Sequence, residues 1–393
     1  KEAVQLVMEQ CEFVGTETVS LHEAYGRVLA EPIIAEHDVP PFNRSAYDGY
    51  AIRAEDSANA TENRPVAFHV IGEIGAGHVG EKPLREKEAY RIMTGAILPE
   101  NADAIVMLEE TEETDVGFTI TRRFQLNDNI SFQGEDAKQG ERLIEEGSII
   151  HPGTIALLAT FGYAKVKVAK RPIVSIISTG TELLDVSEAL QPGKIRNSNG
   201  PFGMMEDDLD ACTEIVEKAL TESNIVITTG GVSVGDYDYL PAIYERIGAK
   251  VLFDKVMMRP GSVTTVAVLG EKFLFGLSGN PSACFTGFEL FARPAILKMM
   301  GNHSPFMPRM KARLGEDFPK KNPFTRFIRA IWEMDSDGPI VVPAGFNKSN
   351  AVSSIARGNC LIVLPSDSEG FRKGMEVDVL LLGQELGVAT WDL

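Results

Sequence analysis

One short stretch, residues 225–239, constrains the fold more than any other part of the chain. Its sequence is IVITTGGVSVGDYDY. The β-branched apolar run at 225–227 predicts a buried strand, and the amphipathic run at 239–247 predicts a helix. A glycine loop between a strand and a helix is how parallel α/β folds bind anions, because glycine lets the backbone approach a phosphate. Asp236 and Asp238 follow the loop and repel a bare phosphate, so they indicate a phosphate that arrives with a divalent metal.

Composition restricts the class of protein. A chain of 393 residues predicts about two to four domains. The hydrophobic content of 44% and the charged content of 24% are typical of a soluble globular protein. We expect no membrane association, because no apolar run is long enough to span a bilayer and no signal peptide is visible. The net charge of −18 argues against binding of nucleic acid, although a few local cations can still bind a small anion.

The cysteines and histidines show no metal-binding spacing. The four cysteines are scattered and form no C-x-x-C motif, which favours reduced thiols and a cytoplasmic location. They are Cys11, Cys212, Cys284 and Cys360. The six histidines also lie far apart, so we expect no zinc site of the His/Cys type.

The first 170 residues predict a discontinuous domain with an insertion. Helical spacing is present at 1–12, and Ser20 with Glu23 forms a capping box that predicts a second helix ending near Leu29. Another helix is expected at Pro152–Phe161, starting with proline. Because these flanking segments lack a core of their own, we expect residues 1–40 and 136–170 to form one domain, with residues 41–135 inserted as a small β domain.

The inserted segment has the pattern of short strands and turns. Strands are expected at Val66–Ile71, Tyr90–Met93, Ala104–Met107 and Phe118–Thr121. Thr94 and Gly95 fall at the end of one strand, and the acidic run 109–115 is expected to be a solvated hairpin edge. Residues 42–53 are rich in turn formers, which predicts a loop that presents Asp48.

Residues 171–302 change to an α/β pattern. Strands are expected at Ile173–Ile177, Ile225–Ile227, Val251–Met257, Thr264–Leu269 and Phe273–Gly276, and helices at Leu209–Leu220 and Ala283–Met300. A strand is also expected at Gly203–Met205, but only Pro201 and Phe202 separate it from residues 193–200. A parallel crossover takes about a dozen residues. Either this is a real deletion or a mobile helix is missing from the numbering, and we favour the second alternative.

The last part of the chain, residues 303–393, is predicted to be all-β. Strands are expected at Lys311–Leu314, Phe327–Trp332, Ile340–Pro343, Cys360–Leu364 and Glu376–Leu382. A small barrel or sandwich fits this pattern of short strands and turns.

Several motifs in a fixed order make the chain similar to a known family. They are SAYDGYA (45–51), RIMTGA (91–96), GED (134–136), STGTEL (178–183), TGGVSVGDYD (229–238), GLSGNP (276–281) and SSIARGNCLIVLP (353–365). Together they resemble the bacterial molybdopterin molybdenumtransferase family, MoeA, which is itself similar to the C-terminal domain of gephyrin. The resemblance covers essentially the whole chain.

The resemblance implies a multidomain α/β and β fold. Its parts would be an elongated helical domain, the inserted β domain, a three-layer α/β molybdopterin-binding domain at 171–302, and a C-terminal β barrel at 303–393. It also implies a homodimer, with the active site between the α/β domain of one subunit and the inserted domain of the other.

The reaction that the resemblance implies is metal insertion. Adenylated molybdopterin would bind with molybdate and Mg²⁺, AMP would be released, and the product would be molybdenum cofactor. The expected partners are a molybdopterin adenylyltransferase and downstream molybdoenzyme maturation proteins.

The resemblance also assigns site residues within the α/β domain. Glu182, Asp207 and Asp238 lie at expected strand ends, where open sheets bind ligands, and would hold Mg²⁺ against the pyrophosphate. The same acids could instead cap helices or keep the surface soluble. The phosphate cradle would be formed by Gly230, Gly231, Ser233 and Gly235. A second cradle, on the pterin side, would be formed by Gly279, Asn280 and Pro281.

Residues from two further regions complete the expected site. Asp48, Thr94 and Asp136 would come from the partner subunit, although both acids are also turn formers. Molybdate is a dianion that needs donors, and the family's basic pair corresponds to Lys255 and Arg259, which are otherwise ordinary surface cations. Barrel residues expected to face the same cleft are Arg329 and Ser353.

The chain departs from the family pattern at a few positions. The common K-P-G-K-P is here Arg259-Pro260-Gly261-Ser262-Val263, so Ser262 carries no charge where a lysine is frequent. Asn43 and Tyr47 replace a frequent aspartate and methionine. Ser278 replaces a common proline and adds a donor for an oxyanion.

Two other functions are compatible with these motifs. A molybdopterin adenylyltransferase uses a related α/β domain, but the extra domains at 41–135 and 303–393 argue against it. A non-catalytic molybdopterin-binding scaffold would tolerate loss of Asp48 and Asp238, which an insertase would not. The sequence leaves open the choice between tungstate and molybdate, the order of substrate binding and the effect of Ser262.

Overall fold

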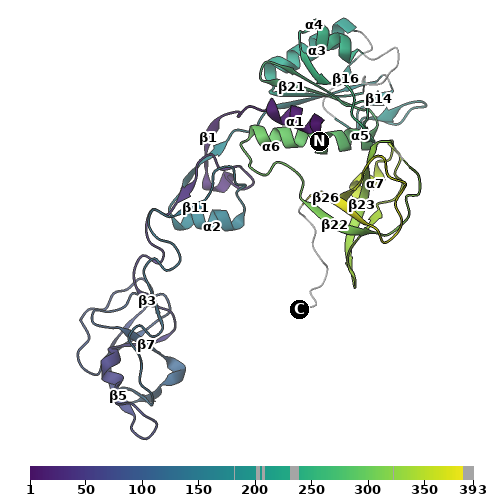
Figure 1. The fold of residues 1–393 in the computed structure, drawn as a ribbon. Helices are drawn as coiled ribbons and strands as arrows, with labels where there is room; N and C mark the ends of the chain where they lie inside the picture. Colours follow the sequence, from purple (N-terminus) through teal and green to yellow (C-terminus); the bar gives the residue numbers. More distant parts are fainter. Residues whose placement is uncertain (181, 201–203, 206–208, 231–238, 322, 384–393) are drawn as a thin grey trace.

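The protein is elongated, with a β-rich unit at one end of a narrow neck and the α/β and barrel parts at the other (Figure 1). The computed structural model describes residues 1–180, 182–200, 204–205, 209–230, 239–321 and 323–383. Within these ranges, no helix has the length and apolar character needed to cross a membrane.

The neck is built from short strand pairs that join the two sides of the insertion. β1 (Thr16–Ser20) pairs with β12 (Lys165–Ala169), and β2 (Ile33–Ile34) pairs with β11 (Arg142–Ile144), all antiparallel. The helix α2 (Pro152–Thr160) covers them and begins with proline, as predicted. Residues from both sides of the insertion therefore share one small core.

One predicted helix in this region is wrong. The capping box of Ser20 and Glu23 is present, but it starts only the single 3-10 turn η1 (Leu21–Glu23). Gly26 then takes a positive φ of 71°, and the amide of Leu29 donates to the carbonyl of Ser148 at 2.9 Å. Pairing with the returning chain has overridden the local helical pattern.

The inserted unit is a sheet with strand order β7-β4-β6-β5-β9-β8. Its strands are β4 (Gly49–Ile52), β5 (Val66–Ile74), β6 (Glu88–Ile92), β7 (Ala104–Met107), β8 (Glu112–Thr114) and β9 (Gly117–Ile120). Around it lie β3 (Arg44–Ser45), β10 (Ile130–Ser131), η2 (Ala54–Ser57) and η3 (Leu108–Glu110). The core is aromatic: Phe118 stacks on Tyr50 and Phe68, with ring centroids 3.9 and 5.3 Å apart.

The strands predicted in the inserted unit are confirmed. Of the acidic run 109–115, residues 112–114 form the exposed edge strand β8, whereas Glu109 and Glu110 lie in the turn η3. Sequence reasoning missed β4, which lies inside the segment expected to be a loop. β4 is fully buried and pairs with both β6 and β7, so Asp48 stands immediately before a central strand.

The α/β part is a sheet with strand order β16-β13-β17-β21-β20-β18. Its strands are β13 (Val174–Thr179), β16 (Met204–Met205), β17 (Ile225–Thr229), β18 (Lys250–Phe253), β20 (Thr265–Leu269) and β21 (Lys272–Leu277), with the short pair β14 (Leu183–Leu184) and β15 (Ile195–Arg196) beside them. The first four strands in the order are parallel. β20 runs antiparallel to β21, and β18 runs antiparallel to β20, so β20 alone in this sheet has the opposite direction. The segment with the unusually short predicted crossover, Pro201 and Phe202, lies outside the described residues.

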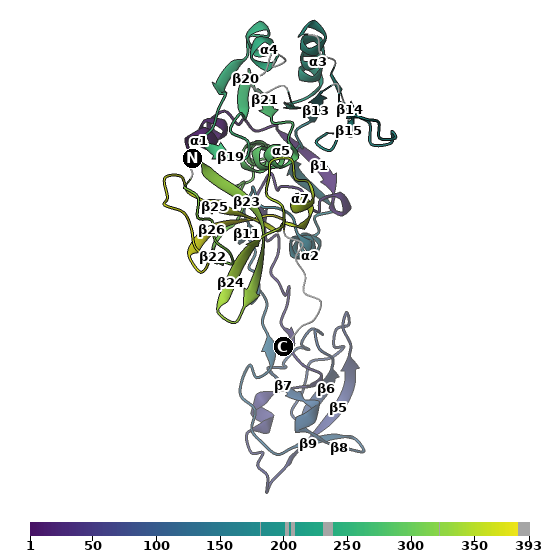
Figure 2. The same ribbon diagram turned by 90° about the vertical axis from the view of Figure 1, so that its right-hand side faces the viewer.

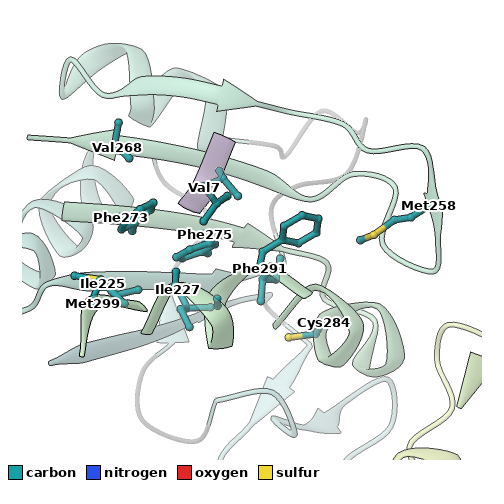
Figure 3. Close-up of a cluster of buried hydrophobic side chains, with 14 residues drawn as sticks. Val7, Ile225, Ile227, Met258, Val268, Phe273, Phe275, Cys284, Phe291 and Met299 are labelled. Carbon is teal, nitrogen blue, oxygen red and sulfur yellow. The ribbon is translucent and has the colours of Figure 1, made fainter. Parts of the chain in front are cut away.

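Helices cover both faces of this sheet (Figure 2). One face carries α3 (Leu209–Glu222) and α4 (Leu240–Arg246), both of which were predicted. The other carries α1 (Glu2–Glu9), whose Val7 packs against Phe275 and Phe291 (Figure 3). The three-layer arrangement is therefore confirmed.

The long helix predicted at 283–300 is a continuous run of α5 (Pro281–Gly287), a π-helical segment η4 (Phe288–Ala292) and α6 (Arg293–Met299). Pro294 has no amide hydrogen to donate to the carbonyl of Leu290, which explains an irregular turn at this point.

The C-terminal part is a closed barrel. The order β23-β24-β22-β26-β25 is closed by pairing of β25 with β23. Its strands are β22 (Arg309–Leu314), β23 (Thr325–Asp335), β24 (Gly338–Pro343), β25 (Cys360–Leu364) and β26 (Glu376–Leu381), and α7 (Ser353–Arg357) lies beside them. The predicted strand at 251–257 ends early because the chain leaves the α/β sheet and forms β19 (Met258–Arg259), which joins β23 of the barrel.

Candidate functional site

Three parallel strands end side by side in the α/β part. β13, β17 and β21 pair in register, and Ser178, Thr229 and Leu277 lie near their carboxyl ends. The amide of Gly230 donates to the carbonyl of Leu277 at 3.0 Å. Gly230 has a φ of 94°, and a Cβ there would lie 2.5 Å from Oγ1 of Thr179, so only glycine fits. This edge is where ligands bind in open α/β sheets.

Polar side chains hold the strand ends together. The hydroxyls of Ser178 and Thr229 lie 3.0 Å apart, and Ser178 also donates to the side-chain oxygen of Asn197 at 3.2 Å. The side-chain amide of Asn199 donates to the carbonyl of Gly279 at 2.8 Å. The segment after β15 is therefore tied to the loop after β21, which positions Ser278 and Asn280.

A pocket rich in cations, the basic pocket, lies where this loop meets β19 and the barrel. It has a volume of about 590 Å³. Its cationic residues are Arg259, Lys320, Lys321 and Arg326, and its polar residues are Ser262, Ser278, Asn280, Asn347 and Ser349. No described residue that lines the basic pocket is acidic. In a chain with a net charge of −18, such a concave cationic surface is suited to an anion.

A larger cavity, of about 1120 Å³, lies between α1, the helix of α5 to α6 and the barrel. Its surface is mostly apolar, with Val4, Met8, Leu290 and Phe306 among the residues that line it. Because a charged substrate needs donors and cations, we assign the chemistry to the smaller basic pocket.

The structure brings three predicted residues together in the basic pocket: Arg259, Ser278 and Asn280. Lys255 is not among them, because its side chain is exposed and does not line the pocket. The side chain of Arg329 is 2% exposed and donates to the hydroxyl of Ser354 at 2.9 Å and to the carbonyl of Lys348 at 3.2 Å. Arg329 thus supports the loop that carries Asn347 and Ser349, and Ser353 is exposed at the start of α7.

The start of α5 has fewer free backbone N–H groups for an anion than the sequence predicted. Asn280 is the N-cap residue, and Pro281 has no amide hydrogen. The amide of Ser282 donates to the carbonyl of Ser349 at 3.0 Å, and its hydroxyl donates to the carbonyl of Ala351 at 2.5 Å. The first turn of this helix is therefore used to fasten the barrel loop, and a cradle here would rest on Gly279 and Asn280.

Only part of the predicted acid cluster lies within the described residues. Glu182 is exposed in the turn after β13, and its carbonyl accepts from the amide of Ile195 at 2.9 Å. Five predicted residues lie outside the described ranges: Asp207, Gly231, Ser233, Gly235 and Asp238. Among the described residues there is no group of three metal-ligating side chains, and Glu182 is the one predicted Mg²⁺ ligand that can be placed.

Asp48 and Thr94, which were predicted from separate motifs, are in direct contact in the inserted unit. One carboxylate oxygen of Asp48 accepts from the amide of Thr94 at 2.7 Å and from its hydroxyl at 2.9 Å. These hydrogen bonds, with help from Arg91, lower the pKa of Asp48. Asp48 is exposed at the start of β4, so an ionised carboxylate faces solvent.

Asp136 lies at the neck, and its side chain is exposed. Its amide donates to the carbonyl of Val39 at 3.0 Å. The inserted unit that carries Asp48 lies at the far end of the molecule from the barrel and the α/β part (Figure 1). A single chain therefore keeps Asp48 and Thr94 apart from the basic pocket.

Sequence reasoning missed several residues of the basic pocket: Lys320, Lys321, Arg326, Asn347 and Ser349. The Lys320–Lys321 doublet beside Pro323 was a usable signal in an acidic chain. Arg326 gave no such signal, because only the pairing of β23 with β19 places it beside Arg259.

Comparisons with known proteins agree with this architecture along the chain. Three family models match in succession: the MoeA N-terminal region (domain I and II) at residues 1–162, a probable molybdopterin binding domain at 202–298, and the MoeA C-terminal region (domain IV) at 311–382.

Relatives of this chain cover it almost completely. A molybdopterin molybdenumtransferase from Staphylococcus aureus is 52% identical, over 97% of this chain and 94% of its own length. One from Staphylococcus epidermidis is 51% identical over the same shares. The crystal structure of a molybdopterin biosynthesis MoeA protein from Pyrococcus horikoshii OT3 matches with a TM-score of 0.83 at 34% identity, over 97% of this chain and 98% of that one. This chain therefore belongs to the MoeA family, that of the molybdopterin molybdenumtransferases.

Proposed function

We propose that this protein inserts molybdenum from molybdate into adenylated molybdopterin, with release of AMP and formation of molybdenum cofactor. The observation that carries the proposal is the basic pocket at the junction of the strand ends and the barrel. It offers cations and hydroxyl donors to an oxyanion, and no acidic residue lines it within the described part of the chain. Membership of the MoeA family supports the same activity.

The roles of the pocket residues follow from their chemistry. Arg259 would bind the molybdate dianion by charge-assisted hydrogen bonds, and Ser278 and Asn280 would orient its oxygens. Gly230 and Gly279 let the backbone approach a phosphate of the substrate closely, since side chains are absent there. The two hydrogen bonds from Ser282 to the carbonyls of Ser349 and Ala351 join the start of α5 to the barrel and keep these groups in fixed positions.

We infer that Mg²⁺ is the accompanying metal. Glu182, Asp207 and Asp238 would hold it, and it would neutralise charge on the pyrophosphate of the bound substrate. The exposed position of Glu182 at the end of β13 is compatible with this role. Gly231, Ser233 and Gly235, which the sequence predicts to lie in a glycine loop, would contact the phosphates.

The shape of the molecule supports a homodimer in which the site is shared. The Asp48–Thr94 pair lies in the inserted unit, far from the basic pocket of the same chain (Figure 1). If these residues and Asp136 act in the reaction, a second copy must bring them to the pocket. The discontinuous domain at 1–40 and 136–170 would then be the arm between the two halves of the site.

We further propose that the protein works in the cytoplasm. It would take its substrate from a molybdopterin adenylyltransferase and pass its product to molybdoenzyme maturation proteins. The chemistry of an adenylated substrate requires an enzyme that adds the adenylyl group beforehand.

The test is AMP release from adenylated molybdopterin in Mg²⁺, with and without molybdate. We expect molybdate-dependent AMP release by the full chain and a severe loss in the variant Arg259→Gln. Arg142→Gln is the matched control, because Arg142 is exposed, lies in the neck and pairs with Glu145 at 2.9 Å. Tight binding of the adenylate without AMP release would overturn the proposal in favour of a scaffold, and ATP-dependent adenylation of molybdopterin would favour the adenylyltransferase.

A further inference from the structure

A second arginine stands directly beside Arg259. β19 and β23 pair in parallel, and their register places Met258 opposite Thr325 and Arg259 opposite Arg326. Both arginines line the basic pocket, one from the α/β part and one from the barrel. The strand pair that joins the two parts of the molecule therefore also brings two guanidinium groups to one surface.

Both arginines make cation–π contacts with aromatic rings. The guanidinium of Arg259 lies over the ring of Phe324, 4.4 Å from its centroid, and that of Arg326 lies 5.8 Å from the centroid of Phe318. Such contacts fix the orientation of a guanidinium without neutralising its charge. Among the ion pairs of the described residues, none includes Arg259 or Arg326.

Two neighbouring cations without a carboxylate repel each other, and burial adds to the cost. Burial, and after it the charge of Arg259, lowers the pKa of Arg326. A dianion bound between them would remove this repulsion. The arrangement is thus unfavourable when empty and favourable when an anion is bound.

The segment that follows Arg259 carries a neutral residue at the position where the K-P-G-K-P motif has a second lysine. Ser262 lines the pocket beside Arg259 and provides a hydroxyl only. Arg326, on β23 of the barrel, brings a positive charge to the same pocket. A guanidinium also presents its donors as a planar fork, which suits an oxyanion better than the point charge of a lysine.

We propose that Arg326 binds the molybdate dianion together with Arg259, and that it supplies from the barrel the charge that Ser262 lacks. This inference rests on the proposed function. The pocket volume of about 590 Å³ leaves room beside the ion for part of the second substrate. Arg326 is therefore a residue for recognition of the oxyanion, distinct from those that contact the pterin.

The first experiment measures binding of sodium molybdate alone to the full chain by calorimetry. We expect Arg326→Gln to lose about tenfold or more in affinity, as for loss of a charge-assisted contact. Arg326→Lys should lose less, because it keeps the charge and loses the fork. Arg142→Gln should bind as the unmodified protein does. Equal affinity of Arg326→Gln and the unmodified protein would overturn the inference.

A second experiment uses AMP release to separate the two substrates. Arg326→Gln should raise the KM for molybdate and leave the KM for adenylated molybdopterin within about twofold. The double variant Ser262→Lys, Arg326→Gln should recover much of the lost affinity for molybdate, a result that a merely structural role of Arg326 does not predict. An increase only in the KM for adenylated molybdopterin would contradict the inference and place a substrate phosphate on this arginine.

The outcomes also separate this inference from the proposed function. If the unmodified protein binds molybdate through Arg326 but releases no AMP, the oxyanion site stands and the proposed reaction fails. If AMP release depends on molybdate while Arg326→Gln binds and turns over molybdate normally, the reaction stands and the role of Arg326 fails. Thermal unfolding of each variant shows whether the barrel is intact.

Discussion

At the scale of single residues, the contact between Asp48 and Thr94 fixes the charge of an exposed carboxylate. Two donors from one residue stabilise the ionised form, and the pKa of Asp48 is lowered for that reason. In the folded protein the carboxylate therefore stays ionised to a lower pH than in the unfolded chain. This contribution to stability is present above the ordinary aspartate pKa and is lost as the pH falls through the lowered one.

Thr94→Val should move this titration. The variant removes the hydroxyl donor and keeps the amide donor, so the pKa of Asp48 should rise part of the way toward its ordinary value. If Asp48 acts in the reaction as an anion, the acid limb of the pH profile of AMP release should shift to higher pH. The control is Thr111→Val in the same unit, whose hydroxyl donates to the carbonyl of Leu108 instead. An unshifted profile for Thr94→Val would contradict the assignment.

Three of the four cysteine thiols should be chemically inert in the folded protein. Burial raises the pKa of Cys284 and of Cys360 to about 12, and that of Cys11 to about 11. Because the thiolate is the reactive form, we expect very slow alkylation of these three by iodoacetamide near neutral pH, and rapid alkylation after denaturation. Peptide mass spectrometry of the labelled chain measures this, and fast labelling of Cys284 or Cys360 in the native protein would refute it.

At the scale of elements, the inserted unit depends on close approach of its central strands. A Cβ on Gly49 would lie 2.0 Å from the carbonyl oxygen of Val106 on β7. Gly49→Ala should therefore separate β4 from β7 and destabilise the unit by about 1–3 kcal/mol. Since Asp48 precedes Gly49, activity should fall as well.

The matched control for Gly49→Ala is Gly75→Ala in the same unit, where a Cβ would meet His78 at an ordinary 3.7 Å. Hydrogen exchange of residues 41–135 measures the effect separately from the rest of the molecule. Equal protection of the Gly49→Ala and Gly75→Ala variants would show that the β4–β7 contact is adaptable.

Sequence patterns predicted elements well where packing follows local alternation. The strands of the inserted unit and of the barrel, and helices α3 and α4, were found because one face of each is buried. The helix expected after Ser20 was wrong because Leu29 is paired by a strand far along the chain. β4 was missed because turn-forming residues such as Asp48 and Gly49 stand at its start. All four of its residues are buried, so it also lacks the alternation of buried and exposed positions.

The candidate site was predictable to a similar degree. Motifs placed Arg259, Ser278 and Asn280, which do meet in the basic pocket. They also suggested Arg329, which the structure buries under the barrel loop. Arg326 could not be foreseen, since a parallel pairing of two residues from each of β19 and β23 brings it into the pocket. A pairing of only two residues per strand, between segments far apart in the sequence, produces no periodic pattern from which it could be predicted.

At the scale of the whole molecule, a site shared between two copies makes a specific prediction. Asp48→Ala and Arg259→Gln should each cause a severe loss of AMP release, because each removes one of the two parts that a complete site needs. In a mixed dimer one site carries both changes and the other carries none. Co-expression of the two variants should therefore restore about one quarter of the normal activity.

The measurement is AMP release by the co-purified mixture against each variant alone, with differently tagged chains to verify that mixed dimers form. Activity no higher than the sum of the parents, in a preparation that contains mixed dimers, would mean that each chain works by itself. It would also remove Asp48 from the reaction at the basic pocket.

The geometry of the neck also determines whether the inserted unit can be removed from the rest of the protein. The chain leaves and re-enters it at neighbouring points: Val39 and Ala137 form a bridge, and the side chain of Asp38 accepts from the amide of Gln139 at 2.9 Å. The inserted unit is thus a cassette whose two ends meet. Excision of residues 41–135 and closure with a short linker should leave the basic pocket formed. The same two junctions should also allow the inserted unit to be exchanged for that of a relative.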